Sequence, residues 1–289
     1  MFHTVAYTTT IQSADGLKAL PTVADTIFSP SGNAYLLPTD LKLLAAYAGS
    51  LAITKARINA PSLLRVGFPS IRPVQQVTAP APSGTPTADP NLMTLLDSPI
   101  ALRTGEPVGL DAATFTTSPA ENAVGLLWFA EKLEPVPPGD SFWLRFTTTT
   151  TLSAALKWSV ISPTFDQSFP SGTYAVIGLE LTSPGAVAAR VVFPGSIFRP
   201  GVVAQVGSLA AATVGAARTH QCFYDGSFGV FGTFQTSAPP SVEVFSVSAD
   251  AAATIEGYLR VVRIGDVGAL PPAPTGSPSP SLPAAMARR

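Results

Sequence analysis

One pattern of residues occurs twice along this chain, and it constrains the fold more than any local motif does. Residues 56–65, with Arg57, and residues 189–199, with Arg190, share an order of small residue, arginine, branched residue, proline and final arginine, at an offset of 133 in sequence position. Residues 125–144 and 229–245 match at an offset of 102, each with a Pro-Pro pair between two strand-like runs. An insertion at residues 77–119 of the first copy accounts for the difference of 31. The pattern predicts two copies of one folding unit; an accidental match between proline-rich segments is the alternative.

Proline and glycine set the secondary structure, because 29 prolines and 23 glycines spread along 289 residues seldom leave room for a long helix. Runs rich in Val, Ile, Thr and aromatic residues remain between them, and they predict β-strands. In the first half these are residues 3–12, 51–58, 62–66, 71–77, 124–130 and 142–151. In the second half they are residues 156–161, 173–181, 186–193, 202–206, 219–224, 228–234, 242–247 and 255–264. Such spacing is typical of an all-β sandwich or barrel.

Few short helices are expected beside these strands. Thr39 and Asp40 are suited to capping a helix over residues 41–48, and Asp89-Pro90 to starting one over residues 92–96. The domain expectation is a first unit over residues 1–150 with a proline-rich insertion around 77–119. A second unit is expected over residues 151–269, followed by a proline-rich tail over 270–289.

Composition indicates a protein that hides much of its surface. Charged residues are only 12% of the chain and hydrophobic residues 46%, with a mean hydropathy of +0.32. A soluble domain typically has about 25% charged residues. A tightly assembled subunit explains these values better than a secreted monomer with a neutral surface. The net charge of −1 and the lack of a basic arm argue against strong direct binding to nucleic acid.

The chain offers few groups for catalysis. His3 and His220 are the only histidines, Cys222 is the only cysteine, and no metal-ligand spacing occurs, so we expect no enzyme, cofactor or metal site. The repeated Arg57 and Arg190 are candidate interface residues that bind loop carbonyls or a partner's carboxylate, and solvated strand ends are the equal alternative. Arg288 and Arg289, at the end of the tail, are further candidates for contact with phosphates, although chance explains two terminal charges better.

A resemblance to a known family rests on a series of short motifs in residues 150–265. They are Phe169-Pro170-Ser171-Gly172-Thr173-Tyr174, Ala188-Ala189-Arg190, Phe198-Arg199-Pro200-Gly201, Gly229 with Gly232, and Pro239-Pro240 before a strand. In this order they resemble the double jelly-roll major capsid proteins of small tailless bacteriophages.

The resemblance implies two eight-stranded jelly rolls in one chain and a pseudo-hexagonal homotrimer that tiles an icosahedral shell. It also implies localisation in the virion after synthesis in the host cytoplasm. The expected partners are further copies of the chain, penton or minor capsid proteins and, as in some relatives, an internal lipid membrane. Arg199, Pro200 and Gly201 join Arg57 and Arg190 as candidate interface residues.

A virion spike or carbohydrate-binding β-sandwich is the alternative function. It would present Trp128, Trp143 or Trp158 in an exposed groove, whereas their apolar strand surroundings favour burial in the core.

Overall fold

A computed structural model gives the structure of the chain. It describes residues 1–11, 16–50, 53–66, 70–71, 74–75, 92–114, 121–152, 156–182, 186–205, 218–219, 226–246 and 250–265. Within these ranges the protein is all-β: its strands form antiparallel sheets, with one short parallel pairing, and the described residues contain a single 3-10 helix and no α-helix. The all-β class expected from the sequence is therefore confirmed.

The first half of the chain forms two sheets. Sheet 1A has the order β1 (Phe2–Ile11), β12 (Glu121–Ala130), β5 (Leu41–Ser50) and β10 (Ile100–Leu102), and β8 (Val74–Gln75) and β9 (Met93–Thr94) also pair with β5. Sheet 1B has the order β3 (Ser29–Ser31), β4 (Ala34–Leu36), β11 (Pro107–Thr114), β6 (Ile53–Asn59) and β7 (Ser70–Ile71), and β2 (Lys18–Ala19) pairs with β11. Apolar side chains from both sheets, such as Leu43, Ile58, Leu110 and Leu127, fill the core between them.

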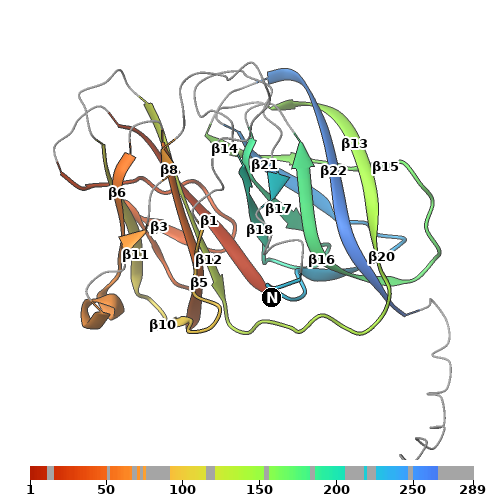
Figure 1. Cartoon of the computed structure of the whole chain (residues 1–289), viewed down its shortest axis with the longest axis horizontal. Helices are drawn as coiled ribbons and strands as arrows, with labels where there is room; N and C mark the ends of the chain where they lie inside the picture. Colours follow the sequence, from red (N-terminus) through yellow and green to blue (C-terminus); the bar gives the residue numbers. More distant parts are fainter. Residues whose placement is uncertain are drawn as a thin grey trace, which may run out of the picture.

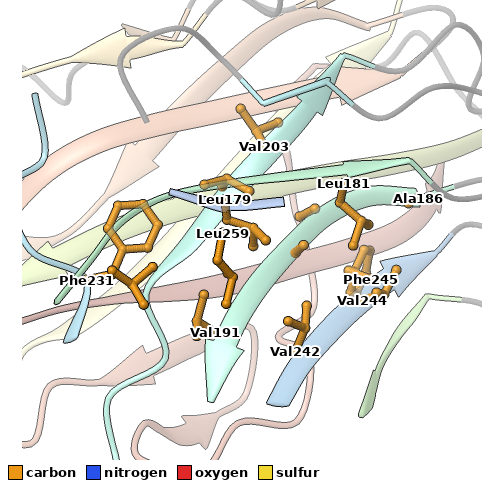
Figure 2. Packing of buried hydrophobic residues seen from close by; sticks show 14 of the residues in the cluster. Leu179, Leu181, Ala186, Val191, Val203, Phe231, Val242, Val244, Phe245 and Leu259 are labelled. Carbon is orange, nitrogen blue, oxygen red and sulfur yellow. The ribbon is translucent and has the colours of Figure 1, made fainter. Parts of the chain in front are cut away.

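The second half also forms two sheets. Sheet 2A has the order β15 (Thr164–Phe165), β13 (Ser141–Leu152), β22 (Asp250–Gly265), β16 (Thr173–Thr182) and β20 (Gly232–Gln235). Sheet 2B has the order β14 (Lys157–Ile161), β21 (Ser241–Ser246), β17 (Ala186–Val192), β18 (Gly201–Gln205) and β19 (Arg218–Thr219). Figure 2 shows how Leu179 and Leu259 of sheet 2A meet Val191 and Val242 of sheet 2B in the core.

The two halves have the same strand order. The path β1-β12-β5-β10 of sheet 1A corresponds to β13-β22-β16-β20 of sheet 2A, and β4-β11-β6-β7 of sheet 1B corresponds to β14-β21-β17-β18 of sheet 2B. The chain enters these strands in the same succession in each half. The first positions of four of the eight corresponding pairs keep a nearly constant offset: 132 from β5 to β16, 133 from β6 to β17, 132 from β10 to β20, and 134 from β11 to β21. The offsets of the other four pairs range from 123 to 139. The halves lie side by side, with the N-terminus near the boundary between them (Figure 1).

The strand correspondence supports one of the two sequence matches and contradicts the other. The offset of 133 joins β6 to β17, which are corresponding strands. The match between residues 125–144 and 229–245, at an offset of 102, is wrong. It aligns β12 with the turn before β20, whereas the counterpart of β12 is β22. A Pro-Pro pair can occur in the turn between any two strands, so the two pairs aligned connections that do not correspond. No insertion is needed over residues 77–119, since β9, β10 and β11 of the first half arise from that segment; residues 77–91 and 115–119 lie outside the described part.

Other expectations were wrong in detail. The helix predicted over residues 41–48 is strand β5, and the one over 92–96 is the short strand β9 followed by a turn. The strand predicted over residues 62–66 is a 3-10 helix, η1 (Pro61–Val66). β5 is buried on both faces, and an apolar run of that kind has no alternation that would distinguish a strand from a helix. The boundary expected at residue 150 falls inside β13, which pairs with β22, so the chain passes between the two halves at residues 131–140.

Candidate functional site

The two halves meet along one buried contact, which we call the seam. It joins the outer face of sheet 1A, around Phe2, Thr4 and Trp128, to sheet 2B and its neighbouring loops. The indole Nε1 of Trp128 donates to the carbonyl of Gly201 at 2.8 Å, and Phe2 packs edge-on against Phe231 with ring centroids 4.8 Å apart. Trp128 and Phe2 are fully buried and belong to the same apolar cluster as the core of the second half. The seam therefore continues the core across both halves.

Backbone hydrogen bonds reinforce the seam at Thr4. The amide of Thr4 donates to the carbonyl of Arg199 at 3.0 Å, and the amide of Gly201 donates to Thr4 Oγ1 at 2.9 Å. A Cβ atom at Gly201 would lie 2.9 Å from the carbonyl oxygen of Ala189 and 3.0 Å from Thr4 Cβ. The strands approach so closely here that a side chain at position 201 would push the halves apart.

A buried ion cluster lies in the seam and is centred on Arg190. Its Nε donates to Glu243 Oε2 at 2.6 Å, and its Nη1 donates both to Asp25 Oδ2 at 2.6 Å and to the carbonyl of Thr4 at 2.9 Å. The guanidinium carbon lies 4.1 Å from the ring centroid of Trp158. The side chains of Arg190 and Asp25 are each 1% exposed. Glu243 comes from the second half and Asp25 from the first, so Arg190 holds the two halves together by charge.

His3 completes the cluster in its neutral form. Its Nε2 lies 3.0 Å from Asp25 Oδ1, its Nδ1 accepts the amide of Arg199 at 2.9 Å, and its ring stacks on Phe28. Because Nδ1 is an acceptor, Nε2 carries the single proton and donates it to Asp25. Burial lowers the pKa of His3 below 6.5, although its bond to Asp25 opposes this change.

Asp25 is ionised in this arrangement. Burial alone would raise its pKa, but the hydrogen bond from His3, the charge of Arg190 and the amide of Ile27 bring the pKa below its usual range. The cluster thus contains a carboxylate, a second carboxylate on Glu243, one guanidinium and a neutral imidazole.

The other candidate residues occupy different positions. Arg57 pairs with Asp111 across β6 and β11 at 2.8 Å, and its side chain is 37% exposed. The carbonyl of Pro200 accepts the amide of Val191 at 2.8 Å, and Arg199 Nη1 donates to the carbonyl of Ser196 at 2.7 Å. Arg190, Arg199, Pro200 and Gly201 thus lie together at the seam, whereas Arg57 lies on the outer face of sheet 1B. Arg288, Arg289, His220 and Cys222 lie outside the described residues.

The sequence did not reveal the partners of Arg190. Asp25 lies in a connecting segment without a recognisable pattern, and the neighbours of His3 in sequence indicate no role for it. Glu243 carried a signal that was not used: its position is offset by 132 from that of Asp111, and each carboxylate pairs with the repeated arginine of its own half. The duplicated feature is an arginine–carboxylate pair across two strands, of which only the arginine was recognised.

The three tryptophans do not line a common groove. Trp128 is buried in the seam, and Trp158 lies half-buried beneath Arg190 with its ring 5.2 Å from that of Phe245. Trp143 lies on the outer face of sheet 2A and is 38% exposed. The expectation of core burial therefore holds for Trp128 and is wrong for Trp143.

The described residues gather no group of three or more His, Cys, Asp and Glu side chains that would hold a metal ion. Nor does that part of the chain contain a helix of the length and apolarity needed to cross a membrane.

Comparisons with known proteins give a distant likeness among solved structures. No family model and no curated protein matches the sequence. Among solved structures, the chain is similar to the major capsid protein P2 of bacteriophage PM2. The sequence identity is 12% over 90% of this chain and 98% of that chain, and the TM-score is 0.24. A TM-score of this size establishes neither a common fold nor a common function.

Proposed function

We propose that this chain is a major capsid protein, a double jelly roll whose copies form the shell of an icosahedral virus. The observation that carries the proposal is the repeated strand order. Each half contains two facing sheets of four corresponding strands, and the chain alternates between those sheets in the same succession twice. Eight strands in two sheets are the architecture of a jelly roll, and viral capsid domains commonly have it.

The seam and the composition support a structural function. The seam buries Trp128, Arg190 and Asp25 between two β-sandwiches, which are therefore suited to packing against one another. Each charged group of the cluster has a partner within the chain, and the side chains of Arg190, Asp25 and His3 are at most 1% exposed, so a substrate has no access to them. The low charged fraction of 12% and the net charge of −1 suit a subunit with many identical neighbours.

The remaining features of the proposal follow from the family that the sequence motifs resemble. Three copies form a pseudo-hexagonal trimer, and trimers form the shell of a virion assembled after synthesis in the host cytoplasm. Penton or minor capsid proteins complete the shell, and some members of that family enclose a lipid membrane beneath it. Strong direct binding of the genome is not expected, because the net charge is −1 and the sequence has no basic arm.

Light scattering after size exclusion, followed by electron microscopy of negatively stained particles, tests this proposal. The expected mass is about 89 kDa, three times the 29.8 kDa of the chain, and the expected outline is hexagonal. A stable monomer that forms neither trimers nor a lattice at any concentration would overturn it.

One observation favours a second candidate function, carbohydrate binding. The exposed Trp143 and the half-buried Tyr258 form an edge-to-face pair on sheet 2A, with ring centroids 6.4 Å apart, and aromatic rings of this kind can bind sugars. A glycan array distinguishes the two functions: glycan binding by the wild type that is lost in Trp143→Ala would support this candidate.

A further inference from the structure

We propose that the seam is repeated between copies of the chain, with the outer face of sheet 2A of one copy packed on the outer face of sheet 1B of the next. This inference rests on the proposed function and specifies which surfaces join the trimer. The internal seam is a head-to-tail contact, because sheet 1A meets sheet 2B and the two sheets are not corresponding ones. Sheet 2A corresponds to 1A, and sheet 1B corresponds to 2B. The outer faces of sheets 2A and 1B lie outside the internal seam. They correspond to the outer faces of sheets 1A and 2B, which form that seam.

The strand register shows which residues of sheet 2A take the places used in the seam. In sheet 1A, Thr4 lies opposite Trp128 and Tyr7 lies opposite Gly125. In sheet 2A, Trp143 lies opposite Arg260 and Phe146 lies opposite Gly257. The positions of Gly257 and Arg260 are offset by 132 from those of Gly125 and Trp128, the same offset that relates β5 to β16. Trp143 and Arg260 thus occupy the positions of Thr4 and Trp128, the pair that contacts the second half.

The outer face of sheet 2A carries the side chains that dominate protein interfaces. Trp143 packs edge-on against Tyr258, and the guanidinium carbon of Arg260 lies 5.9 Å from the centroid of the Trp143 ring. Arg260 Nη2 also donates to Ser141 Oγ at 3.2 Å. Tryptophan, tyrosine and arginine are enriched among residues that contribute most to binding. Since these three are already held against one another, little side-chain freedom would be lost on docking.

The outer face of sheet 1B presents the counterpart of the buried ion cluster. Arg57 pairs with Asp111 at the same position across β6 and β11 where Arg190 pairs with Glu243 across β17 and β21. In the seam, Arg190 receives a second carboxylate from the facing half and its side chain is 1% exposed, whereas that of Arg57 is 37% exposed. The Arg57 pair therefore has the charge and the position of the Arg190–Glu243 pair, but within the described part of the chain no second sheet packs over it.

Sheet 2A also has a carboxylate on the short segment that runs along its first long strand. The segment that leads to Asp25 runs along β1, where Thr22 bridges to Tyr7. The short strand β15 runs along β13, where Phe165 pairs with Phe146, the counterpart of Tyr7. Asp166 follows Phe165 directly and its side chain is 30% exposed. Asp166 pairs with Arg145 of its own copy and aligns with Val23 rather than with Asp25, so sheet 2A offers an exposed ion pair here and not an exact copy of the Asp25 position.

A head-to-tail contact closes into a ring when its rotation divides a full turn, and otherwise forms an open filament. Because each chain already contains one such contact between its two halves, three chains supply six halves and six equivalent contacts. The ring of three is therefore the same trimer that the proposed function requires.

Sedimentation velocity over a range of concentrations tests the surfaces, with Trp143→Ala altering sheet 2A and Arg57→Ala altering sheet 1B. Each variant is expected to weaken the trimer by about tenfold or more in dissociation constant, as for the loss of an interface anchor. Ile197→Ala removes a side chain that is 61% exposed and outside both faces, and it should leave association unchanged. Circular dichroism of each variant establishes that it is folded; should Trp143→Ala unfold, Arg260→Ala on the same face replaces it.

Mixing the two variants provides a sharper test. Trp143→Ala keeps an intact 1B face and Arg57→Ala keeps an intact 2A face, so a head-to-tail contact allows one wild-type contact between them. The mixture should therefore form a two-chain species at concentrations where each variant alone is monomeric. A wild type that never forms trimers would overturn the proposed function. A trimeric wild type whose two variants associate as tightly as it does would overturn the surfaces proposed here and leave the shell function in place.

Discussion

Removal of the Arg190 side chain is the most direct test of the seam. Arg190→Ala would leave the carboxylates of Asp25 and Glu243 buried without their cation, and would remove the guanidinium from the face of Trp158. Breaking a buried ion pair by deleting one partner costs about 3–5 kcal/mol, because the remaining charge is neither solvated nor paired. At roughly 2 °C per kcal/mol for a chain of this size, the midpoint of thermal unfolding should fall by about 6–10 °C.

Differential scanning calorimetry measures this change, and two further variants interpret it. Lys157→Ala removes an exposed cation from β14 of the same sheet and should shift the midpoint by no more than about 1 °C. The triple variant Arg190→Met, Asp25→Asn and Glu243→Gln removes the cation together with both anions, so it should recover more than half of the loss. A shift below about 2 °C for Arg190→Ala, or a triple variant no more stable than the single one, would refute the reasoning.

Three other predictions address the seam and its surroundings. The pKa of His3 is lower in the folded protein than in the unfolded chain, so the free energy of unfolding should decline as the pH falls below about 6.5, by up to about 1.4 kcal/mol per pH unit. The variant His3→Gln should flatten that part of a curve of stability against pH, and an unchanged slope would contradict the assignment. Trp128→Phe leaves the buried carbonyl of Gly201 without its donor and should cost about 1–3 kcal/mol in urea unfolding. Gly229→Ala places a Cβ in collision with the carbonyl oxygen of Glu134, so it should lower the melting temperature far more than Gly195→Ala, which has a similar φ but open space around it; equal effects would argue against this packing.

The sequence predicted the class of the fold better than its connections. Prolines and glycines spread along the whole chain leave little room for long helices, so the all-β class followed from composition. β5 was predicted as a helix because its burial on both faces removes the alternation that identifies a strand. The match between β12 and the turn before β20 failed because it relied on turn residues, which carry no information about the strands that they join.

The candidate site was predicted in part. Arg190 was identified because its pattern recurs at Arg57, and a comparison of the carboxylates at the same offset would have added Asp111 and Glu243. The residues of the first half that bind Arg190 could not be found in this way. Thr4 lies 186 residues and Asp25 165 residues from Arg190 along the chain, and only the packing of one sandwich on the other brings them together. Neither residue is marked locally by a pattern that indicates such a role.

The short connection between the halves has a consequence for the strength of the seam. Residues 131–140 tether β12 to β13, so the two sandwiches always remain within reach of each other. A short tether provides an effective concentration in the millimolar range, whereas separate chains meet only at their actual concentration in solution. The halves should therefore stay joined at any dilution. If a protease cut this tether, the association of the two halves would become dependent on protein concentration.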